Sequence, residues 1–392
     1  MKGKRAIIKP VEELCVALFY SKTVMSEKKL RYPHLIFIFP LFNGPYGGER
    51  HCLRLTSALA EKGLTVSICT LDFPKSLTTF LHSKVQLMEG VFPHIDNHNL
   101  KTLASIFWMR KLAHVLYTTY PQNTKQSTNI CLIGMGWQSV LCLHILRKYF
   151  SKRIYFCLEP PRFLYDLRAS GNFGAKASSI ILGHVLRSWD KKAVRSTPII
   201  LANSARTQHD VQNLYHRESS VLIPGIETER FQYWSKAEAK QKLNVGNGTI
   251  YISVGKLHKR KRIDKAIQLF IDRETQSQQQ NYGRFYIIGT GPEKTALQYL
   301  VEKLKKTCEN KAVENIFFLG ELDDKTVALY MRAADYFIFT AQNEPFGLVI
   351  QEAKAAGCTI LPHDIQLPLC TWEEACEQFL KLLNEKMKLF PE

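Results

Sequence analysis

Two spacings of apolar residues alternate along the chain from residue 31 onward. Short apolar runs such as 34–39, bounded by glycine or proline, predict buried strands. Longer segments such as 49–62 carry apolar residues at intervals of three and four, which predicts helices with one buried face. Up to residue 224 the pattern predicts strands at 34–39, 65–71, 129–133, 153–158 and 199–202, and helices at 49–62, 100–117, 138–149 and 179–195.

The alternation pauses over residues 225–248, which are polar and mixed, and then resumes. The second series predicts strands at 249–254, 285–288, 316–319, 335–340 and 358–361, and helices at 263–272, 293–305, 324–333 and 346–356. Strands separated by helices form parallel sheets that are covered on both faces. The predicted fold class is therefore α/β, with two doubly wound, parallel-sheet domains in tandem.

The same pattern sets the expected domain limits. They are a basic tail at 1–30, a first domain at 31–224, a linker at 225–248, a second domain at 249–371 and an amphipathic helix at 372–392. In doubly wound sheets, ligands bind outside the carboxyl ends of the strands. The loops that follow the strands are therefore the places to look for a site.

The composition of the chain indicates the kind of partner, through its net charge, and the cellular compartment, through its cysteines. The net charge of +18 favours polyanionic partners: phosphorylated ligands, nucleic acid or an anionic membrane surface. The ten cysteines form no CxxC pair and lie mostly in apolar stretches, which predicts buried, reduced thiols in a cytoplasmic protein. We expect neither a signal peptide nor a membrane-spanning helix, because no apolar run approaches the roughly 20 residues that a span requires.

Two loops have the composition of phosphate sites. Gly47 and Gly48 lie between a predicted strand and helix, where backbone can approach a phosphate, although a plain tight turn explains them equally well. The loop from Gly255 to Arg262 holds five basic residues, and Lys256 and Lys261 bracket it. Its place in a strand-to-helix connection favours a diphosphate site. A nuclear localisation patch, a contact with nucleic-acid phosphate and a solvated loop are the alternatives.

Two further loops complete the candidates. Gly289 and Gly291 either admit a second backbone at close range or simply form a turn. The segment from Glu344 to Glu352 places one carboxylate before a predicted helix and a second about two turns into it. The backbone N–H groups of Phe346, Gly347 and Leu348 are natural phosphate ligands at that helix start. The alternative is a capping acid and an unrelated surface glutamate.

Taken in order, these segments resemble the family 4 glycosyltransferases. Glu344-Pro-Phe-Gly-Leu-Val-Ile-Gln-Glu352 resembles the E-x7-E motif of that family, and Gly47-Gly48-Glu49-Arg50 its first glycine loop. Glu159-Pro-Pro-Arg162 resembles an E-P-P-R stretch, Gly255 to Lys261 the phosphate loop, and Gly289-Thr-Gly-Pro292 the G-x-G-P turn. The resemblance spans residues 35–361 and implies the GT-B fold, in which two Rossmann-like domains face each other across a cleft.

The resemblance also implies roles. Lys256 and Lys261 would hold the diphosphate of a nucleotide-sugar donor, Glu344 would contact the sugar, and Glu352 would bind the ribose. Phe346 and Gly347 would donate backbone N–H groups, while Glu159 and Arg162 would lie on the acceptor side. Such an enzyme retains the configuration of the transferred hexose, and the leaving phosphate accepts the acceptor proton. No metal or other cofactor is expected; the partners are a nucleotide sugar and a glycan or lipid-linked acceptor, without nucleic acid.

The sequence departs from the family pattern in three places. Lys256 stands where the family has arginine, which keeps the charge but loses a bidentate donor. Gly134-Met-Gly-Trp137 lacks a histidine that many members place near the sugar. The segment 362–371 is too short for the further βα unit that members usually carry. The missing unit makes an inactive GT-B partner subunit one alternative function. The net charge of +18 and the basic cluster Lys259–Arg262 make a nucleic-acid-binding α/β protein the other.

Overall fold

The computed structural model describes most of the chain. Its described residues are 32–44, 47–90, 92, 93, 95, 98–120, 129–165, 177–276, 282–307, 311–342, 344, 346–363 and 369–388. The basic tail predicted for residues 1–30 lies outside this set. Among the described residues, none of the helices is both long and apolar enough to cross a bilayer.

The first sheet lies in the N-terminal half, and seven of its strands fall within the described residues. All neighbouring strands are parallel. In spatial order they are β3 (Gln86–Glu89), β2 (Val66–Thr70), β1 (His34–Ile38), β4 (Ile130–Met135), β5 (Arg153–Cys157), β6 (Ile199–Ala202) and β7 (Ser220–Val221). β3 and β7 were not predicted: β3 is an edge strand with one fully buried residue, Met88, and β7 has only two residues.

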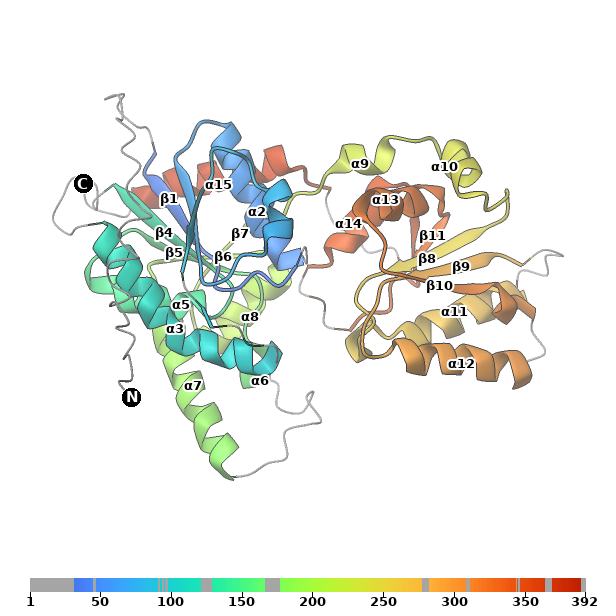
Figure 1. The fold of residues 1–392 in the computed structure, drawn as a ribbon, viewed down its shortest axis with the longest axis horizontal. Coiled ribbons are helices and arrows are strands. Elements are labelled where there is room, and N and C mark those ends of the chain that lie inside the picture. Colours follow the sequence, from blue (N-terminus) through green and yellow to red (C-terminus); the bar gives the residue numbers. More distant parts are fainter. Residues whose placement is uncertain are drawn as a thin grey trace, which may run out of the picture.

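Helices cover both faces of this sheet because side chains alternate along each strand. The elements of this half are α2 (Gly47–Glu61), η1 (Lys75–Phe80), α3 (His98–Thr119), α5 (Ser139–Ile145), η2 (Leu146–Lys148), α6 (Arg162–Tyr165), α7 (Ala177–Arg195) and α8 (Ala205–Tyr215). Leu35 and Phe37 face α2, whereas Ile36 and Ile38 face α3, α5 and α7. Figure 1 shows these layers in the blue and green half of the molecule.

The second sheet has five strands among the described residues, again all parallel. Their order is β10 (Ile316–Gly320), β9 (Arg284–Ile288), β8 (Ile250–Val254), β11 (Tyr336–Ile338) and β12 (Thr359–Leu361). The helical elements are η3 (Lys259–Lys261), α11 (Ile263–Gln276), α12 (Lys294–Thr307), η4 (Lys311–Asn315), α13 (Asp324–Ala333) and α14 (Leu348–Ala355). The two sheets and their helix layers confirm the predicted α/β fold class.

The connections between the two halves are more structured than a polar linker. Residues 225–248 contain α9 (Thr228–Gln232) and α10 (Lys236–Leu243), which pack against α14 and α13 through buried Phe231 and Ala239. The C-terminal helix α15 (Trp372–Met387) returns to the first sheet, where Phe379 lies 6.2 Å from Phe37 between ring centroids. Figure 1 shows α15 beside α2.

The two chain segments that join the halves run side by side. The backbone N–H of Ile226 donates to the carbonyl of Cys370 at 2.8 Å, and Ile226 bridges Thr371 in parallel. The eight described cysteines are all buried and free of disulfides: Cys52, Cys69, Cys131, Cys142, Cys157, Cys358, Cys370 and Cys376.

Two strand-to-helix loops of the second sheet cross at backbone contact. A Cβ on Gly289 would collide with the carbonyl oxygen of Gly255, and a Cβ on Gly291 would collide with that of Leu257. The crossing is tied by the N–H of Gly255 donating to Ile288 and the N–H of Leu257 donating to Thr290. Of the two interpretations left open by the sequence, close backbone approach is therefore the one that the structure supports.

We predict that Gly289→Ala lowers the free energy of unfolding by about 2–4 kcal/mol, because the methyl group displaces the Gly255 loop and Gly289 has a φ of +134°. Urea denaturation measures this. Gly248→Ala is the matched control, since a Cβ there meets no atom within 4 Å. Equal stability of the two variants would contradict the role of the crossing.

Candidate functional site

The candidate site lies where the loops after β8 and β11 meet. Lys261 Nζ lies 3.0 Å from Glu344 Oε2, although 83 residues separate the two in sequence. The strands β8 and β11 are neighbours in the parallel sheet, so their carboxyl ends open at the same edge. The predicted juxtaposition of the basic loop and the first glutamate of the motif is present in the structure.

Hydrogen bonds hold the basic loop in a fixed shape. The Thr340 hydroxyl donates to the carbonyls of Lys261 (3.0 Å) and Arg262 (2.8 Å), and the N–H of Gln342 donates to the carbonyl of Arg260 (3.0 Å). Gly255 has a φ of +145°, and a Cβ there would lie 3.7 Å from Cε of Lys261. Lys261 is thereby held half-buried at the strand edge, while Lys256 is exposed at the other end of the loop.

The start of α14 faces the first domain. Gly347 takes a left-handed φ of +77° as the N-cap and provides no side-chain acceptor for the first turn, which begins at Leu348. A Cβ on Gly47 would lie 3.5 Å from Cδ1 of Leu348. The helix starts of α2 and α14 therefore approach each other from the two domains, and both direct backbone donors and partial positive charge toward the space between them. Phe346 lies in the same loop, before Gly347.

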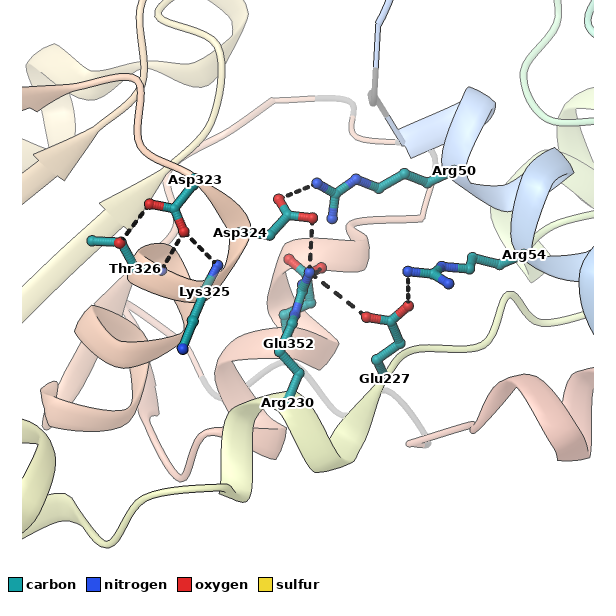
Figure 2. Close-up of polar contacts among 9 residues, drawn as sticks. All are labelled: Arg50, Arg54, Glu227, Arg230, Asp323, Asp324, Lys325, Thr326 and Glu352. Carbon is teal, nitrogen blue, oxygen red and sulfur yellow. Dashed lines mark hydrogen bonds and ion pairs between the residues drawn. The ribbon is translucent and has the colours of Figure 1, made fainter. Parts of the chain in front are cut away.

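The second glutamate of the motif lies in an ion cluster rather than among the basic loop. Glu352 is half-buried on α14, and its Oε1 lies 3.2 Å from Nη2 of Arg230 on α9. Figure 2 shows that Arg230 also contacts Glu227 and Asp324, which in turn contact Arg54 and Arg50 of the first domain. The sequence pattern did not single out Arg230, Glu227 or Asp324, because charges on short amphipathic helices are typical of solvated surfaces.

The acceptor-side candidates contact the basic loop across the domain boundary. Glu159 pairs with Arg162, and Nη1 of Arg260 lies 3.8 Å from Oε1 of Glu159. Burial and the neighbouring charges of Arg260 and Arg206 lower the pKa of Arg162, while Glu344 opposes that change. The structure therefore brings Glu159 and Arg162 to the same edge as Lys261 and Glu344.

Gly48 and Gly291 have structural surroundings that account for the absence of a side chain. A Cβ on Gly48 would lie 3.3 Å from Cδ1 of Leu158, and Gly291 contacts the backbone of Leu257 as described above. The described residues contain no cluster of three or more His, Cys, Asp and Glu side chains that could hold a metal ion.

Glu49 was not predicted as a site residue and appeared only within the segment Gly47–Arg50. It lies in the first turn of α2, beside Gly47 and Gly48. Burial raises its pKa to about 7, although hydrogen bonds from the backbone N–H groups of Glu49 and Asn43 oppose that rise. A carboxyl group that gains a proton near neutral pH therefore lies at the edge of the candidate site.

Comparison with known proteins confirms the family resemblance. The sequence profile described as "Glycosyl transferases group 1" matches residues 235–375. WaaG, a glycosyltransferase involved in lipopolysaccharide biosynthesis, has a similar structure with a TM-score of 0.59 and 18% identity, covering 91% of this chain and 90% of WaaG. Anabaena Alr3699/HepE in complex with UDP and glucose has a TM-score of 0.58 and 14% identity, covering 91% of each chain. These neighbours show that the fold is GT-B.

The curated relatives are distant. D-inositol 3-phosphate glycosyltransferase of Jonesia denitrificans is 23% identical over 184 residues, which are 45% of this chain and 43% of that protein. Alpha-1,3/1,6-mannosyltransferase ALG2 of Mus musculus is 21% identical over 349 residues, which are 86% of this chain and 81% of ALG2. The chain spans less than half of the Jonesia protein and of three further relatives, with matches that cover 32% to 48% of each relative's length.

We predict that Glu49→Gln stabilises the protein at high pH. A carboxyl with a pKa near 7 in the folded state and 4.5 when unfolded favours folding below about pH 4.5, and this contribution is lost as the pH rises through 7. At pH 8 the variant should be about 1–3 kcal/mol more stable than the parent, with little difference at pH 4. Urea titrations at both pH values test this, with Glu61→Gln on the exposed side of the same helix as control. A pH-independent difference would contradict it.

Proposed function

We propose that the protein is a retaining glycosyltransferase that moves a hexose of the mannose or glucose type from a nucleotide sugar to a lipid-linked or glycan acceptor. The observation that carries this proposal is the Lys261–Glu344 pair at 3.0 Å, placed beside the start of α14 and opposite Gly47 of the first domain. A cation, two helix starts and a carboxylate at one sheet edge match the phosphate and sugar of such a donor.

The donor diphosphate would lie between the basic loop and the start of α14. Lys261 has three N–H donors, so it can keep Glu344 and contact a phosphate oxygen at the same time. Lys256 would reach the diphosphate from the exposed end of the loop, and the N–H groups of Phe346, Gly347 and Leu348 would donate to it. Glu344 would then face the sugar, and Glu352 would accept hydrogen bonds from the ribose hydroxyls.

The reaction needs charge stabilisation more than a strong base. The bond between the anomeric carbon and the diphosphate oxygen breaks, and the acceptor oxygen bonds to the same carbon from the same face. The proton of the acceptor hydroxyl passes to the leaving diphosphate. Lys256, Lys261 and the helix start would stabilise the negative charge that develops on that leaving group.

Two features support an acceptor at a membrane surface. The relatives include Alpha-monoglucosyldiacylglycerol synthase of Acholeplasma laidlawii, 28% identical over 198 residues, whose name describes a lipid product. On the first domain, α3 packs against α5 and α5 against α7, and this layer exposes Phe107 (73% accessible) and Trp189 (49%). Exposed basic residues lie on the same layer: Arg110, Lys111, Arg147, Lys148, Lys192 and Arg195. Exposed aromatic and basic side chains together suit an anionic lipid surface.

We predict that the parent protein binds UDP or GDP with micromolar affinity in calorimetric titrations, and that Glu352→Ala weakens this binding by about tenfold or more through loss of the ribose acceptor. Glu373→Ala is the control, because that carboxylate is exposed on α15 and lies 3.5 Å from Lys62, just after the C-terminal end of α2. An active transferase would then give an α-linked product from an α-configured donor. Nucleotide binding without turnover would support the inactive-subunit alternative, and absence of nucleotide binding would overturn the proposed donor site.

We predict that the protein pellets with vesicles containing anionic phospholipid at low salt, and that Phe107→Ser with Trp189→Ser reduces the bound fraction by about threefold or more because two apolar anchors are lost. Tyr299→Ser is the matched control, since Tyr299 is 73% accessible on α12 of the second domain. Equal pelleting of all three proteins would contradict docking through the α3–α5–α7 layer.

A further inference from the structure

Six charged side chains form an ion cluster at the junction of the two domains. Figure 2 shows this arginine–carboxylate cluster, which consists of Arg50, Arg54, Glu227, Arg230, Asp324 and Glu352. Three arginines face three carboxylates, so the formal charges balance. Arg50 and Arg54 come from α2 of the first domain, and the other four come from the second domain and the segment that leads into it.

Arg230 lies at the centre of the cluster. Its Nη2 lies 3.2 Å from Glu352 Oε1, and its Nη1 lies 3.1 Å from Asp324 Oδ2 and 3.8 Å from Glu227 Oε2. The guanidinium carbon also lies 4.6 Å from the ring centroid of Phe231. A planar guanidinium held at both amino groups has little freedom to rotate. Glu352 therefore contacts a guanidinium group whose own position is held by two other carboxylates.

The first domain completes this arrangement. Asp324 Oδ1 pairs with Arg50 while Oδ2 pairs with Arg230, and Glu227 Oε1 pairs with Arg54 while Oε2 pairs with Arg230. Asp323 caps α13 by accepting from the N–H groups of Lys325 and Thr326 at 3.0 Å each, which fixes the helix start that carries Asp324 (Figure 2). Each of these two carboxylates thus joins a first-domain arginine to Arg230.

We propose that Arg230 is a positioning residue for Glu352, and that Arg50 and Arg54 complete its clamp from the first domain. Nucleoside binding at the second domain is then coupled to contact between the domains. The inference rests on the proposed function, because Glu352 acts as the ribose acceptor only there. Arg230 contacts Glu352 through Oε1, so Oε2 is the oxygen that would accept from the ribose.

The electrostatics of Glu352 follow from the same contacts. Burial raises the pKa of this carboxyl, Arg230 and then Arg50 oppose the rise, and Asp324 and Glu227 add to it. An ionised carboxylate accepts hydrogen bonds from the ribose more strongly than a protonated one, so we expect nucleotide affinity to fall as Glu352 gains a proton. Without Arg230 or Arg50, less positive charge offsets the effect of burial, so the pKa of Glu352 rises further. The loss of nucleotide affinity then occurs at higher pH.

Calorimetric titration of UDP and GDP between pH 5 and pH 8 tests the inference on the full chain. We expect Arg230→Met to weaken binding by about tenfold, Arg50→Met by about threefold to tenfold, and both to shift the acidic loss of affinity to higher pH. The double variant should bind within about twofold of Arg230→Met, because Arg50 acts through Asp324 and Arg230. Arg230→Lys should recover part of the affinity.

Lys62→Met is the matched control, because Lys62 lies just after α2 and pairs with Glu373 and Glu377 on α15, outside the cluster. It should leave the affinity and its pH profile unchanged. Parental affinity in Arg50→Met, or additive losses in the double variant, would overturn the coupling. Arg50→Met is informative even if Arg230→Met fails to fold.

The outcomes also separate this inference from the proposed function. A parent protein that binds no nucleotide would overturn the donor site and the inference together. A parent that binds nucleotide, loses it in Glu352→Ala and keeps it in Arg230→Met would overturn the positioning role alone. A lower unfolding temperature in Arg230→Met without a change in the pH profile would show a structural role only, and would likewise overturn the inference.

Discussion

The backbone crossing between Gly255–Leu257 and Gly289–Gly291 is the contact on which the candidate site depends. Two loops from neighbouring parallel strands approach this closely because Gly289 and Gly291 have no Cβ where they meet the backbone of Gly255 and Leu257. Beyond the crossing, the basic loop lies against the residues that follow β11, where Thr340 and Gln342 donate hydrogen bonds to its carbonyls. Lys261 can then reach Glu344. The same backbone crossing thus contributes to the stability of the second sheet and to the position of Lys261.

Much of this arrangement could be predicted from the sequence, because the loops that follow parallel strands all lie at the same edge of the sheet. Topology alone predicted that the loops holding Lys261 and Glu344, 83 residues apart, each follow a strand at the carboxyl edge of the sheet. The resemblance to family 4 glycosyltransferases then assigned both residues to one donor site. The strand expected at 249–254 is β8 at Ile250–Val254. A short apolar run bounded by turn residues is typical of a buried strand, and four of the five residues of β8 are buried.

Most of what the sequence pattern missed has little apolar signal, although it also missed α8, which buries Val211 and Tyr215 four residues apart. β3 contributes one fully buried side chain, Met88, at the edge of its sheet, and α9 and α10 contribute Phe231 and Ala239. One buried residue in an element gives no repeating spacing of apolar positions from which a helix or strand could be predicted. Arg230 was missed for a second reason: the partners of a charged side chain are decided by tertiary contacts, and its three carboxylates come from different positions of the chain.

The charges of the junction show why the two glutamates of the motif are not equivalent. Glu344 pairs with a lysine of the same domain, in a loop whose shape the backbone crossing already fixes. Glu352 pairs with an arginine whose other contacts reach the first domain through Asp324 and Glu227. Breaking a pair in water costs little, but a half-buried carboxylate that loses its arginine keeps the cost of burial. The second glutamate is therefore sensitive to how the domains meet, whereas the first depends on its own sheet.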